Sequence, residues 1–495
     1  MAQKGFIPGP GIPVSCRILR NLFPLFSTIH YITEMSRYHN ASIEMLDRSD
    51  LDDLIDARIR YTVKYAQEHS PFYRHWFREN GIDPAEIRVH EDLFRLPVIS
   101  GRTIREHQPP QTPEFRFLSA DWGDIFTIQE TSGTSGTPKS FFLTWDDWKR
   151  YAEKYSRSFV SQGFDRKDRV VVCASYGMNV GANTMTLAAR GIGMTIIPFG
   201  RCDFASRVIT AYRPTSIVGS VFKLLRLARR LESEGIDPKQ SGIERLVAGG
   251  ESFADESRAY LSGVWGCPVY NTYGSTEGTM CGECTALAGL HVPEDLVHLD
   301  IYDPQMRDFV HDGNTGRAVL TTLLPEGAKA GTLLLNYDTE DTTRVLSRAP
   351  CSCGRTHMRI ANPQREAENF NVFGAAVNRV DIEAGVFQPE NMAFLTGEYE
   401  AFLLGGESSG KVVLQVVVEC MDPERTDRRS VQDRFTDHFG RRRQELTRLA
   451  GDHAFGIEFA FVRPGELGIH AAKGRPKRLT DRRQQRSTPE IPLAA

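Results

Sequence analysis

The stretch TSGTSGTPK, from Thr131 to Lys139, lies between two short β-rich runs at residues 125–128 and 140–143. Its glycines allow the backbone to approach an anion, its hydroxyl groups add hydrogen-bond donors, and Lys139 adds a positive charge. It is not a Walker A loop, because Pro138 stands where a glycine should precede the lysine and a strand rather than a helix follows. A flexible Ser/Gly linker would usually lack the lysine and would rarely lie between apolar strands. We therefore interpret the stretch as a loop that holds phosphate groups.

The sequence on both sides of this loop predicts an α/β core. Residues 51–100 are typical of a helix followed by a polar connection. Beyond the loop, further β-rich runs occur at residues 170–173, 195–198, 216–218 and 246–247. Leu224, Leu227 and Leu231 recur at helical spacing and predict a helix over residues 221–231. Alternation of short strands with helices is the pattern of an α/β fold.

A second unit is predicted after the turn at Ala361, Asn362 and Pro363. It contains a strand at residues 412–418, a charged helix from about residue 430 to 449, and a strand at residues 456–462. We therefore expect an α/β protein with a large multi-layer N-terminal domain (residues 1–362) and a small mobile α+β C-terminal domain (residues 363–483). The polar, proline-containing residues 484–495 are predicted to form a disordered tail.

The composition is that of a globular enzyme. Hydrophobic residues make up 40% and charged residues 25% of the 495 residues, which leaves ample apolar surface to bury. A net charge of -3 predicts no broad surface for nucleic acid or anionic membranes. The apolar residues 18–32 are interrupted by Arg20, Asn21, Pro24 and His30, so we expect neither a signal peptide nor a membrane span. Nine cysteines without secretory features favour a reducing cytoplasm.

Two further motifs follow the loop along the chain. YGSTEG begins at Tyr273 after an apolar run, and NYDTED, which ends at Asp341, follows a second apolar run. In this order and spacing, TSGTSGTPK, YGSTEG and NYDTED resemble the core motifs of the adenylate-forming superfamily of acyl-CoA ligases and adenylation domains. The segments HSPFYRHWF, EDLFRLPVIS, GGESF and CSCGR resemble the phenylacetate-CoA ligase branch. The resemblance extends from about residue 50 to residue 483.

The resemblance implies an ATP site made of individual residues in these motifs. The residues that bind ATP would be Thr131, Ser132, Gly133, Thr134, Gly250, Glu251, Tyr273, Gly274, Asp341 and Arg365. The loop residues would contact the phosphates, and Tyr273 would stack near the adenine. Asp341 and Arg365 would contact the ribose, and Gly250 with Glu251 would lie beside the adenine and the acyl pocket.

The same resemblance implies the reaction. Lys139 would contact the phosphates, Thr276 would meet the α-phosphate, and Glu277 would hold Mg²⁺, a hard cation that prefers oxygen ligands. An oxyanion would attack the α-phosphorus of ATP while these charges offset the developing negative charge, and pyrophosphate would leave. Taken from the residues alone, Asp341 could be a turn residue and Glu277 a carboxylate at a helix N-terminus.

Cysteine and histidine residues form a candidate metal site. Cys281, Cys284, His291, Cys351 and Cys353 supply two short ligand pairs separated by a long loop, as in a closed tetrahedral Zn²⁺ site. Our chosen set is Cys284, His291, Cys351 and Cys353, and Cys281 could replace Cys284. Similar residues bind structural zinc in some members of the resembled branch. The other interpretation is a group of free buried cysteines.

Two segments depart from the superfamily pattern. Where many members have a Gly-Lys-x-x-Arg segment with a catalytic lysine, this chain has GRPKR at residues 474–478, which puts Arg475 at the lysine position. Lys473 or Lys477 could substitute for that lysine. Where the hinge usually reads Gly-Arg-x-Asp-Asp, this chain has QREAE at residues 364–368, so Ala367 replaces the aspartate that takes the rotation. Rotation of the C-terminal domain therefore stays open.

The leading hypothesis is an ATP-dependent ligase of secondary metabolism that adenylates an aromatic acid and transfers it to CoA, a carrier protein or an amine. The aromatic substrate rests on the resemblance alone. The residues Phe141, Phe142, Tyr176, Met178 and Phe199 could line an acid pocket or belong to an apolar core. We expect a cytoplasmic protein that uses ATP, Mg²⁺ and structural Zn²⁺, with a homodimer left open and no nucleic-acid or membrane partner.

Two other functions stay open at this stage. Because Arg475 and Ala367 alter the segments that serve the lysine contact and the domain swing, the chain could be a diazotase that adenylates nitrite to diazotise an aryl amine. It could also be a nucleotide-binding partner protein without catalysis, although the Mg²⁺ carboxylate of Glu277 argues against that. A zinc-dependent nucleic-acid binder is disfavoured by the acidic residues Glu283, Glu294 and Asp295.

Overall fold

The computed structural model describes residues 37–131, 137–178, 180–200, 205–406, 410–468 and 478–483. The described residues from Tyr38 onward form one compact unit. The predicted site residues Ser132, Gly133, Thr134 and Arg475, like Lys473, Lys477 and the predicted tail, lie outside the described residues. In the part of the chain that the structure describes, no helix is both long and apolar enough to cross a bilayer.

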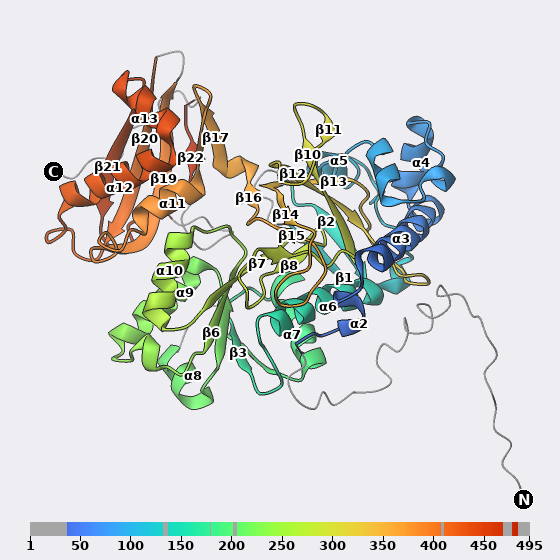
Figure 1. The fold of residues 1–495 in the computed structure, drawn as a ribbon, viewed down its shortest axis with the longest axis horizontal. Coiled ribbons are helices and arrows are strands. Elements are labelled where there is room, and N and C mark those ends of the chain that lie inside the picture. Colours follow the sequence, from blue (N-terminus) through green and yellow to red (C-terminus); the bar gives the residue numbers. More distant parts are fainter. Residues whose placement is uncertain are drawn as a thin grey trace, which may run out of the picture. The chain divides into compact units, whose positions relative to one another are not determined.

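A nine-stranded sheet forms the centre of the structure (Figure 1). Its strands, in spatial order, are β14 (Val345–Ser347), β15 (Arg359–Ile360), β9 (Leu290–His291), β8 (Met280–Gly282), β7 (Val269–Gly274), β6 (Arg245–Gly249), β5 (Ser216–Gly219), β3 (Arg169–Val172) and β4 (Thr195–Pro198). The strands from β7 to β4 are parallel, and β8 pairs antiparallel with β7. The carboxyl ends of the parallel strands therefore share one edge, where such folds bind ligands.

Helices cover both faces of the parallel strands. Successive residues of each strand point to opposite faces, and the two faces pack in two different hydrophobic clusters. Val171, Ile217 and Leu246 pack in one cluster, while Val170, Val218 and Val247 pack in the other. The first cluster includes α8 (Ala205–Tyr212), α9 (Val221–Ser233) and α10 (Asp255–Trp265), and the second includes α6 (Trp145–Ser161) and α7 (Val180–Ile192). The predicted helix at residues 221–231 and the predicted α/β fold are both confirmed.

A second layer is built from the N-terminal helices and an antiparallel sheet. The sheet has the order β11 (Asp308–Phe309), β10 (Val297–Asp303), β12 (Gly316–Thr322), β13 (Tyr337–Thr343) and β16 (Gln364–Arg365). The helices are α2 (Ala41–Glu44), α3 (Arg48–His69), α4 (Pro71–Glu79) and α5 (Gly101–Glu106). The sequence predicted one helix followed by a connection, but the segment after Ser70 is a second helix. Ser70 caps it by accepting a hydrogen bond from the backbone N–H of Tyr73, and Pro71 occupies its first turn.

In the C-terminal part, the residues that the structure describes form two further sheets and three α-helices. Its elements are β17 (Asn369–Val372), β18 (Ala375–Asn378), α11 (Arg379–Val386), β19 (Leu395–Gly406), β20 (Lys411–Cys420), α12 (Arg428–Arg442), α13 (Gln444–Gly451), β21 (Phe455–Val462) and β22 (Thr480–Asp481). The strands predicted at residues 412–418 and 456–462 are confirmed. The hydrophobic cluster of α9 and α10 continues into these elements.

The single charged helix predicted at residues 430–449 is wrong, since the chain leaves the helical conformation at Arg443. Arg443 has φ -131° and ψ 66°, which ends α12 and starts α13. The side chains of Arg442 and Arg443 both form ion pairs with Asp381 of α11, so a tertiary contact sets the break.

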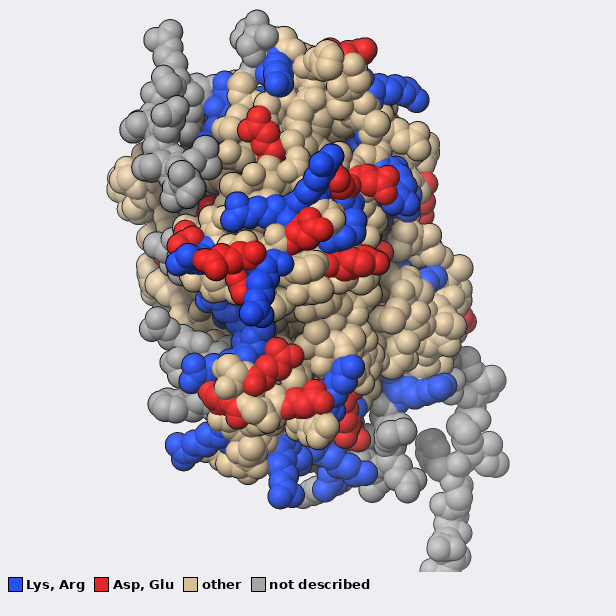
Figure 2. All heavy atoms as spheres, turned by 90° about the vertical axis from the view of Figure 1, so that its left-hand side faces the viewer, with Lys and Arg blue, Asp and Glu red and all other residues tan. Residues whose placement is uncertain are grey.

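Figure 2 shows basic and acidic side chains interspersed on the face turned to the viewer.

The packing of α6 on β8 gives a test of the fold. A Cβ atom added to Gly282 would lie 1.9 Å from Oγ and 2.7 Å from Cβ of Ser158, which is too close for either residue to stay in place. Overpacking of this kind typically costs about 1–3 kcal/mol. We expect Gly282→Ala to lower the midpoint of thermal unfolding, whereas Gly123→Ala, whose added Cβ meets nothing within 4 Å, should leave it unchanged. Equal midpoints for the two variants in differential scanning calorimetry would contradict this packing.

Candidate active site

The predicted phosphate loop is closed at its base by two hydrogen bonds. It connects β1 (Ile125–Glu130) with β2 (Ser140–Thr144), which pair as a two-stranded antiparallel sheet. The backbone N–H of Thr131 donates to the carbonyl of Lys139 at 3.1 Å, and the N–H of Lys139 donates to Oγ1 of Thr131 at 3.0 Å. Gln108 donates to the carbonyl of Pro138 at 2.7 Å and accepts from the N–H of Ser140 at 3.1 Å. These contacts fix where Lys139 leaves the loop.

Lys139 and Glu277, which are far apart in the sequence, meet at the carboxyl edge of the sheet. Nζ of Lys139 lies 2.6 Å from Oε1 of Glu277, and the two side chains are 12% and 10% exposed. The same Nζ donates to the hydroxyl oxygen of Tyr337 at 2.5 Å, and that hydroxyl lies 3.4 Å from Oε1 of Glu277. Burial opposes ionisation of Glu277, but the Lys139 ammonium outweighs it and lowers the pKa of the carboxyl group. The site therefore holds a compact cation and a carboxylate within reach of the loop.

A second polar chain runs along β7, β13 and β16. The hydroxyl of Tyr273 donates to Oδ2 of Asp341 at 2.6 Å, and Nε of Arg365 lies 3.1 Å from Oδ1 of Asp341. Burial raises the pKa of Asp341, although Arg365 and Tyr273 act in the opposite direction. Since the Arg365 side chain is 55% exposed and Asp341 is buried, the pair presents a carboxylate and a guanidinium next to Tyr273.

The structure overturns the alternative interpretations of two of these carboxylates. Asp341 lies within β13, paired with Arg365 of β16, and is not a turn residue. Glu277 lies in the turn between β7 and β8 and not at the start of a helix. Gly249 of β6 is paired with Thr272 of β7, which brings the following residues Gly250 and Glu251 to the same edge as Tyr273. Gly250 has φ +79°, a conformation that favours glycine.

The hinge segment is held by ion pairs on both sides. Arg317 pairs with Glu366 at 2.5 Å, and Arg379 pairs with Glu368 at 2.8 Å. Arg379, which is 2% exposed, also lies 3.7 Å from Glu251 of the GGESF segment. This contact links the start of α11 directly to the edge that carries the site.

The aromatic and methionine residues considered for an acid pocket have different surroundings. Phe141 and Phe142 are each 2% exposed, and Phe142 contacts the rings of Phe115 and Trp122. These two therefore belong to the apolar core. Tyr176 and Met178 are 39% and 53% exposed after the carboxyl end of β3 and are available to a substrate.

Four of the five predicted metal ligands converge. The ligand atoms of Cys284, His291, Cys351 and Cys353 all lie within 4.8 Å of one another, and Cys281 is not part of this group. Cys284 follows β8, His291 lies on β9, and the other two lie in the turn before β15. A hydrogen bond from Cys284 lowers the pKa of the Cys353 thiol, and the His291 ring adds to this effect.

The distances within this group fit a tetrahedral zinc ion. With Zn–S bonds of about 2.3 Å and Zn–N bonds of about 2.05 Å, tetrahedral geometry puts two sulfur ligands roughly 3.8 Å apart and a sulfur and a nitrogen roughly 3.6 Å apart. The sulfurs of Cys284 and Cys351 are 3.8 Å apart, and the Cys353 sulfur lies 3.6 Å from Nε2 of His291.

Three acidic residues near these ligands in the sequence are buried and form ion pairs. They are Glu283, Glu294 and Asp295, which pair with Arg258, Arg48 and Arg157 respectively.

Sequence reasoning missed Tyr337 and Gln108 as site residues. Tyr337 is the tyrosine of NYDTED, so its place in the motif was a usable signal, although no role was assigned to it. It is 1% exposed, yet its hydroxyl reaches both Lys139 and Glu277. Gln108 lies outside the three motifs, and its contacts with Pro138 and Ser140 exist only in the folded chain.

Loss of the Tyr337 hydroxyl gives a direct test of this geometry. Tyr337→Phe keeps the ring in the core but removes a hydrogen bond to a charged group, which is worth about 1.5–3 kcal/mol. We expect the rate of ATP–pyrophosphate exchange to fall by about tenfold or more. Tyr302→Phe, on β10, is the matched control and should not change the rate. An unchanged rate in Tyr337→Phe would show that this hydroxyl does not position Lys139.

A parallel sheet whose carboxyl edge gathers the Lys139–Glu277 pair, Tyr273 and buried Asp341 fits an ATP-dependent, AMP-forming ligase of the adenylate-forming type. The chain belongs to the AMP-binding enzyme family, whose model matches residues 74–321. Within that superfamily it falls in the phenylacetate-CoA ligase-like branch. The predicted superfamily, branch and enzyme class are thus confirmed.

Curated relatives and a solved structure show the extent of the likeness. The phenylacetate-coenzyme A ligase of Thermus thermophilus is 29% identical over 328 residues, which are 65% of this chain and 72% of the relative. The phenylacetate-coenzyme A ligase of Pseudomonas putida is 26% identical over 411 residues, which are 80% of this chain and 90% of the relative. A crystal structure of 2-hydroxyisobutyryl-CoA ligase in the postadenylation state, with 2-HIB-AMP, shares the fold with a TM-score of 0.76. It is 21% identical and the match covers 93% of this chain and 94% of that one.

Proposed function

We propose that this chain joins an aromatic carboxylate to AMP and then transfers the acyl group to CoA. The observation that carries the proposal is the buried Lys139–Glu277 pair, 2.6 Å apart, at the edge that also carries Asp341. The relatives named as phenylacetate-CoA ligases support the aromatic acid and the CoA acceptor. The first step would join a carboxylate oxygen to the α-phosphorus of ATP and break the bond to pyrophosphate. In the second step the CoA sulfur would attack the acyl carbon, AMP would leave, and the thiol proton would pass to solvent.

The residues of the site divide the work of the first step. Lys139 would offset negative charge on the phosphates, since a fixed cation in a water-poor site stabilises developing charge strongly. Thr276 would contact the α-phosphate, while Asp341 and Arg365 would bind the ribose hydroxyls beside Tyr273. Arg475 would supply the positive charge that a lysine supplies in other members. Glu277, an oxygen ligand of the kind Mg²⁺ prefers, would hold that ion, which when bound would withdraw charge from the phosphates.

We also propose that Cys284, His291, Cys351 and Cys353 hold a structural Zn²⁺ ion. All four ligands come from the protein, which is the composition of a closed structural site. The ion would join the segment after YGSTEG to the segment after NYDTED. It would thereby stabilise the end of the nine-stranded sheet formed by β15, β9 and β8, which lies next to β7.

Pyrophosphate exchange tests the proposed reaction. Purified chain, ATP, Mg²⁺ and labelled pyrophosphate would be incubated with a panel of aryl acids including phenylacetate, with acetate and nitrite as further arms. We expect label to enter ATP only with an aryl acid and an acyl-CoA product to form when CoA is added. If label enters ATP only with nitrite, the substrate that is adenylated is nitrite and not a carboxylate. No exchange with any acid would contradict the proposed function.

A further inference from the structure

The turn that carries Thr276 and Glu277 is held from below by two buried side chains of α6. The hydroxyl of Tyr151 donates to the carbonyl oxygen of Thr276 at 2.7 Å. Nζ of Lys154 donates to the carbonyl oxygen of Gly278 at 2.5 Å. The two side chains are 7% and 6% exposed, so the donor side of both hydrogen bonds is shielded from water. The residues on both sides of Glu277 are therefore fixed by the same helix.

Burial makes a lysine at this position costly unless its ammonium group has a partner. A methionine would keep the stem of the side chain without that cost, so packing alone does not explain the amino group of Lys154. The backbone conformation of the turn also indicates a close contact with α6. Gly278 has φ +115°, and a Cβ atom added to it would lie 3.4 Å from the Tyr151 hydroxyl. The glycine thus allows the backbone of the turn to approach α6 closely.

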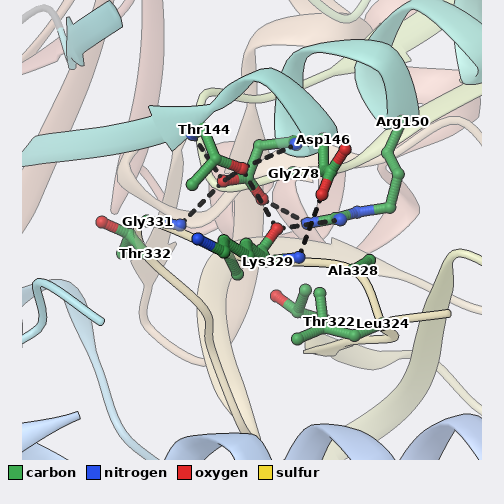
Figure 3. A network of polar contacts seen from close by, with 12 residues as sticks. Thr144, Asp146, Arg150, Gly278, Thr322, Leu324, Ala328, Lys329, Gly331 and Thr332 are labelled. Atoms are coloured by element: carbon green, nitrogen blue, oxygen red, sulfur yellow. Dashed lines mark hydrogen bonds and ion pairs between the residues drawn. The ribbon is translucent and has the colours of Figure 1, made fainter. Parts of the chain in front are cut away.

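Helix α6 is a rigid support because its own N-terminal end is anchored (Figure 3). Oδ2 of Asp147 accepts hydrogen bonds from the N–H groups of Thr144 and Gly331, both at 2.8 Å. Asp146 accepts from the N–H of Lys329 at 3.1 Å. Farther along the helix, Arg157 forms an ion pair with buried Asp295 at 2.6 Å. A displacement of the turn would therefore have to break its bonds to a fixed helix.

We propose that Tyr151 and Lys154 are positioning residues for the adenylation site, which hold the turn so that Glu277 presents its carboxylate to Mg²⁺. The inference rests on the proposed role of Glu277. Both residues contact the backbone of the turn. Their contribution reaches the reaction through the turn, so it depends on an intact Glu277 carboxylate.

The test compares the binding of ATP with and without Mg²⁺ by isothermal titration calorimetry on the full chain. Tyr151→Phe removes one oxygen and Lys154→Met removes the terminal amino group of the lysine. We expect each variant to bind Mg·ATP about five- to tenfold more weakly, as loss of one buried hydrogen bond predicts. Binding of ATP in excess chelator should stay within about twofold, because Lys139 and the phosphate loop are untouched.

Matched controls and a second background separate positioning from general damage. Tyr61→Phe removes a hydroxyl that donates to the Ala328 carbonyl, and Lys149→Met removes a lysine of α6 that pairs with Asp146. Neither control should change Mg·ATP binding. In a Glu277→Gln background, Tyr151→Phe and Lys154→Met should cause no further loss, since the group they position is already gone.

Three outcomes would overturn the inference alone, provided that the wild-type chain binds Mg·ATP. The variants could bind Mg·ATP as well as the wild type, could lose ATP binding equally with and without Mg²⁺, or could lose the same factor in the Glu277→Gln background. If the wild-type chain does not bind Mg·ATP, the proposed function fails and the inference fails with it. Tyr151→Phe deletes a single atom, so it keeps the test available where Lys154→Met lowers stability.

Discussion

Lys139→Met is expected to lower the rate of ATP–pyrophosphate exchange by about a hundredfold or more, since loss of one preorganised charge at a developing anion typically has that effect. Methionine keeps the length and the apolar stem of the side chain but removes the ammonium group that lies 2.6 Å from Glu277. The substitution should also destabilise the nucleotide-free chain, because it leaves the Glu277 carboxylate buried without its ammonium partner. Exchange kinetics and thermal unfolding measure the two effects.

The control for this variant is Lys149→Met. Lys149 lies on α6 and its ammonium group pairs with Asp146, so this substitution should leave the exchange rate unchanged.

The pH dependence of stability gives a further check with a defined sign. Lys139 lowers the pKa of Glu277 in the folded chain, so the pair contributes stability that is lost as pH falls through that lowered pKa. In Lys139→Met, the free energy of unfolding should therefore fall less as the pH is lowered. A variant that keeps wild-type exchange would contradict the role of Lys139.

Removal of the metal ligands is expected to produce the second large effect, a loss of stability. Cys353→Ser should reduce bound zinc from one ion per chain to a small fraction, because a structural site needs its full tetrahedral set. Loss of the ion frees the segments after β8 and before β15, and we expect the midpoint of thermal unfolding to fall by about 5 °C or more. Elemental analysis of the purified chain and differential scanning calorimetry give the two readouts.

Cys281→Ser is the matched control for the zinc prediction. Cys281 is buried and burial raises the pKa of its thiol to about 12, but it lies outside the four-residue group. This variant should keep one zinc ion per chain even where the buried hydroxyl costs some stability. A chain that contains no zinc, or a Cys353→Ser variant that retains it, would contradict the proposed metal site.

Much of the fold and part of the site followed from local patterns. Strand and helix positions in the parallel sheet were predicted because alternating short β-rich runs and helical leucine spacing reflect burial within a few residues. The break at Arg443 was not predicted, because it depends on Asp381, which lies on another element. The second helix after Ser70 was also missed, although a serine followed by a proline is a helix-start signal.

In the candidate site, too, the motifs identified individual residues, while the contacts between them depend on the tertiary structure. Lys139, Glu277 and Asp341 were named from their motifs, but the ion pair between Lys139 and Glu277 joins residues 138 positions apart. Tyr151 and Lys154 occupy an ordinary amphipathic helix, so their sequence pattern indicates only that they face the core. Their contact with the turn at Thr276 to Gly278 arises because α6 packs beside β7 and β8.

By itself the sequence determined that the stretch from Thr131 to Lys139 is a loop suited to phosphate, that an α/β core surrounds it, and that cysteine and histidine residues stand at metal-ligand spacing. Only the tertiary structure decided which of five candidate ligands converge, that Tyr337 joins the Lys139–Glu277 pair, and that α6 supports the turn carrying Glu277. The physical reason is that residue type and spacing set local conformation and chemistry. Which distant side chains meet depends on strand order and helix packing, which bring separate segments to one edge of the sheet.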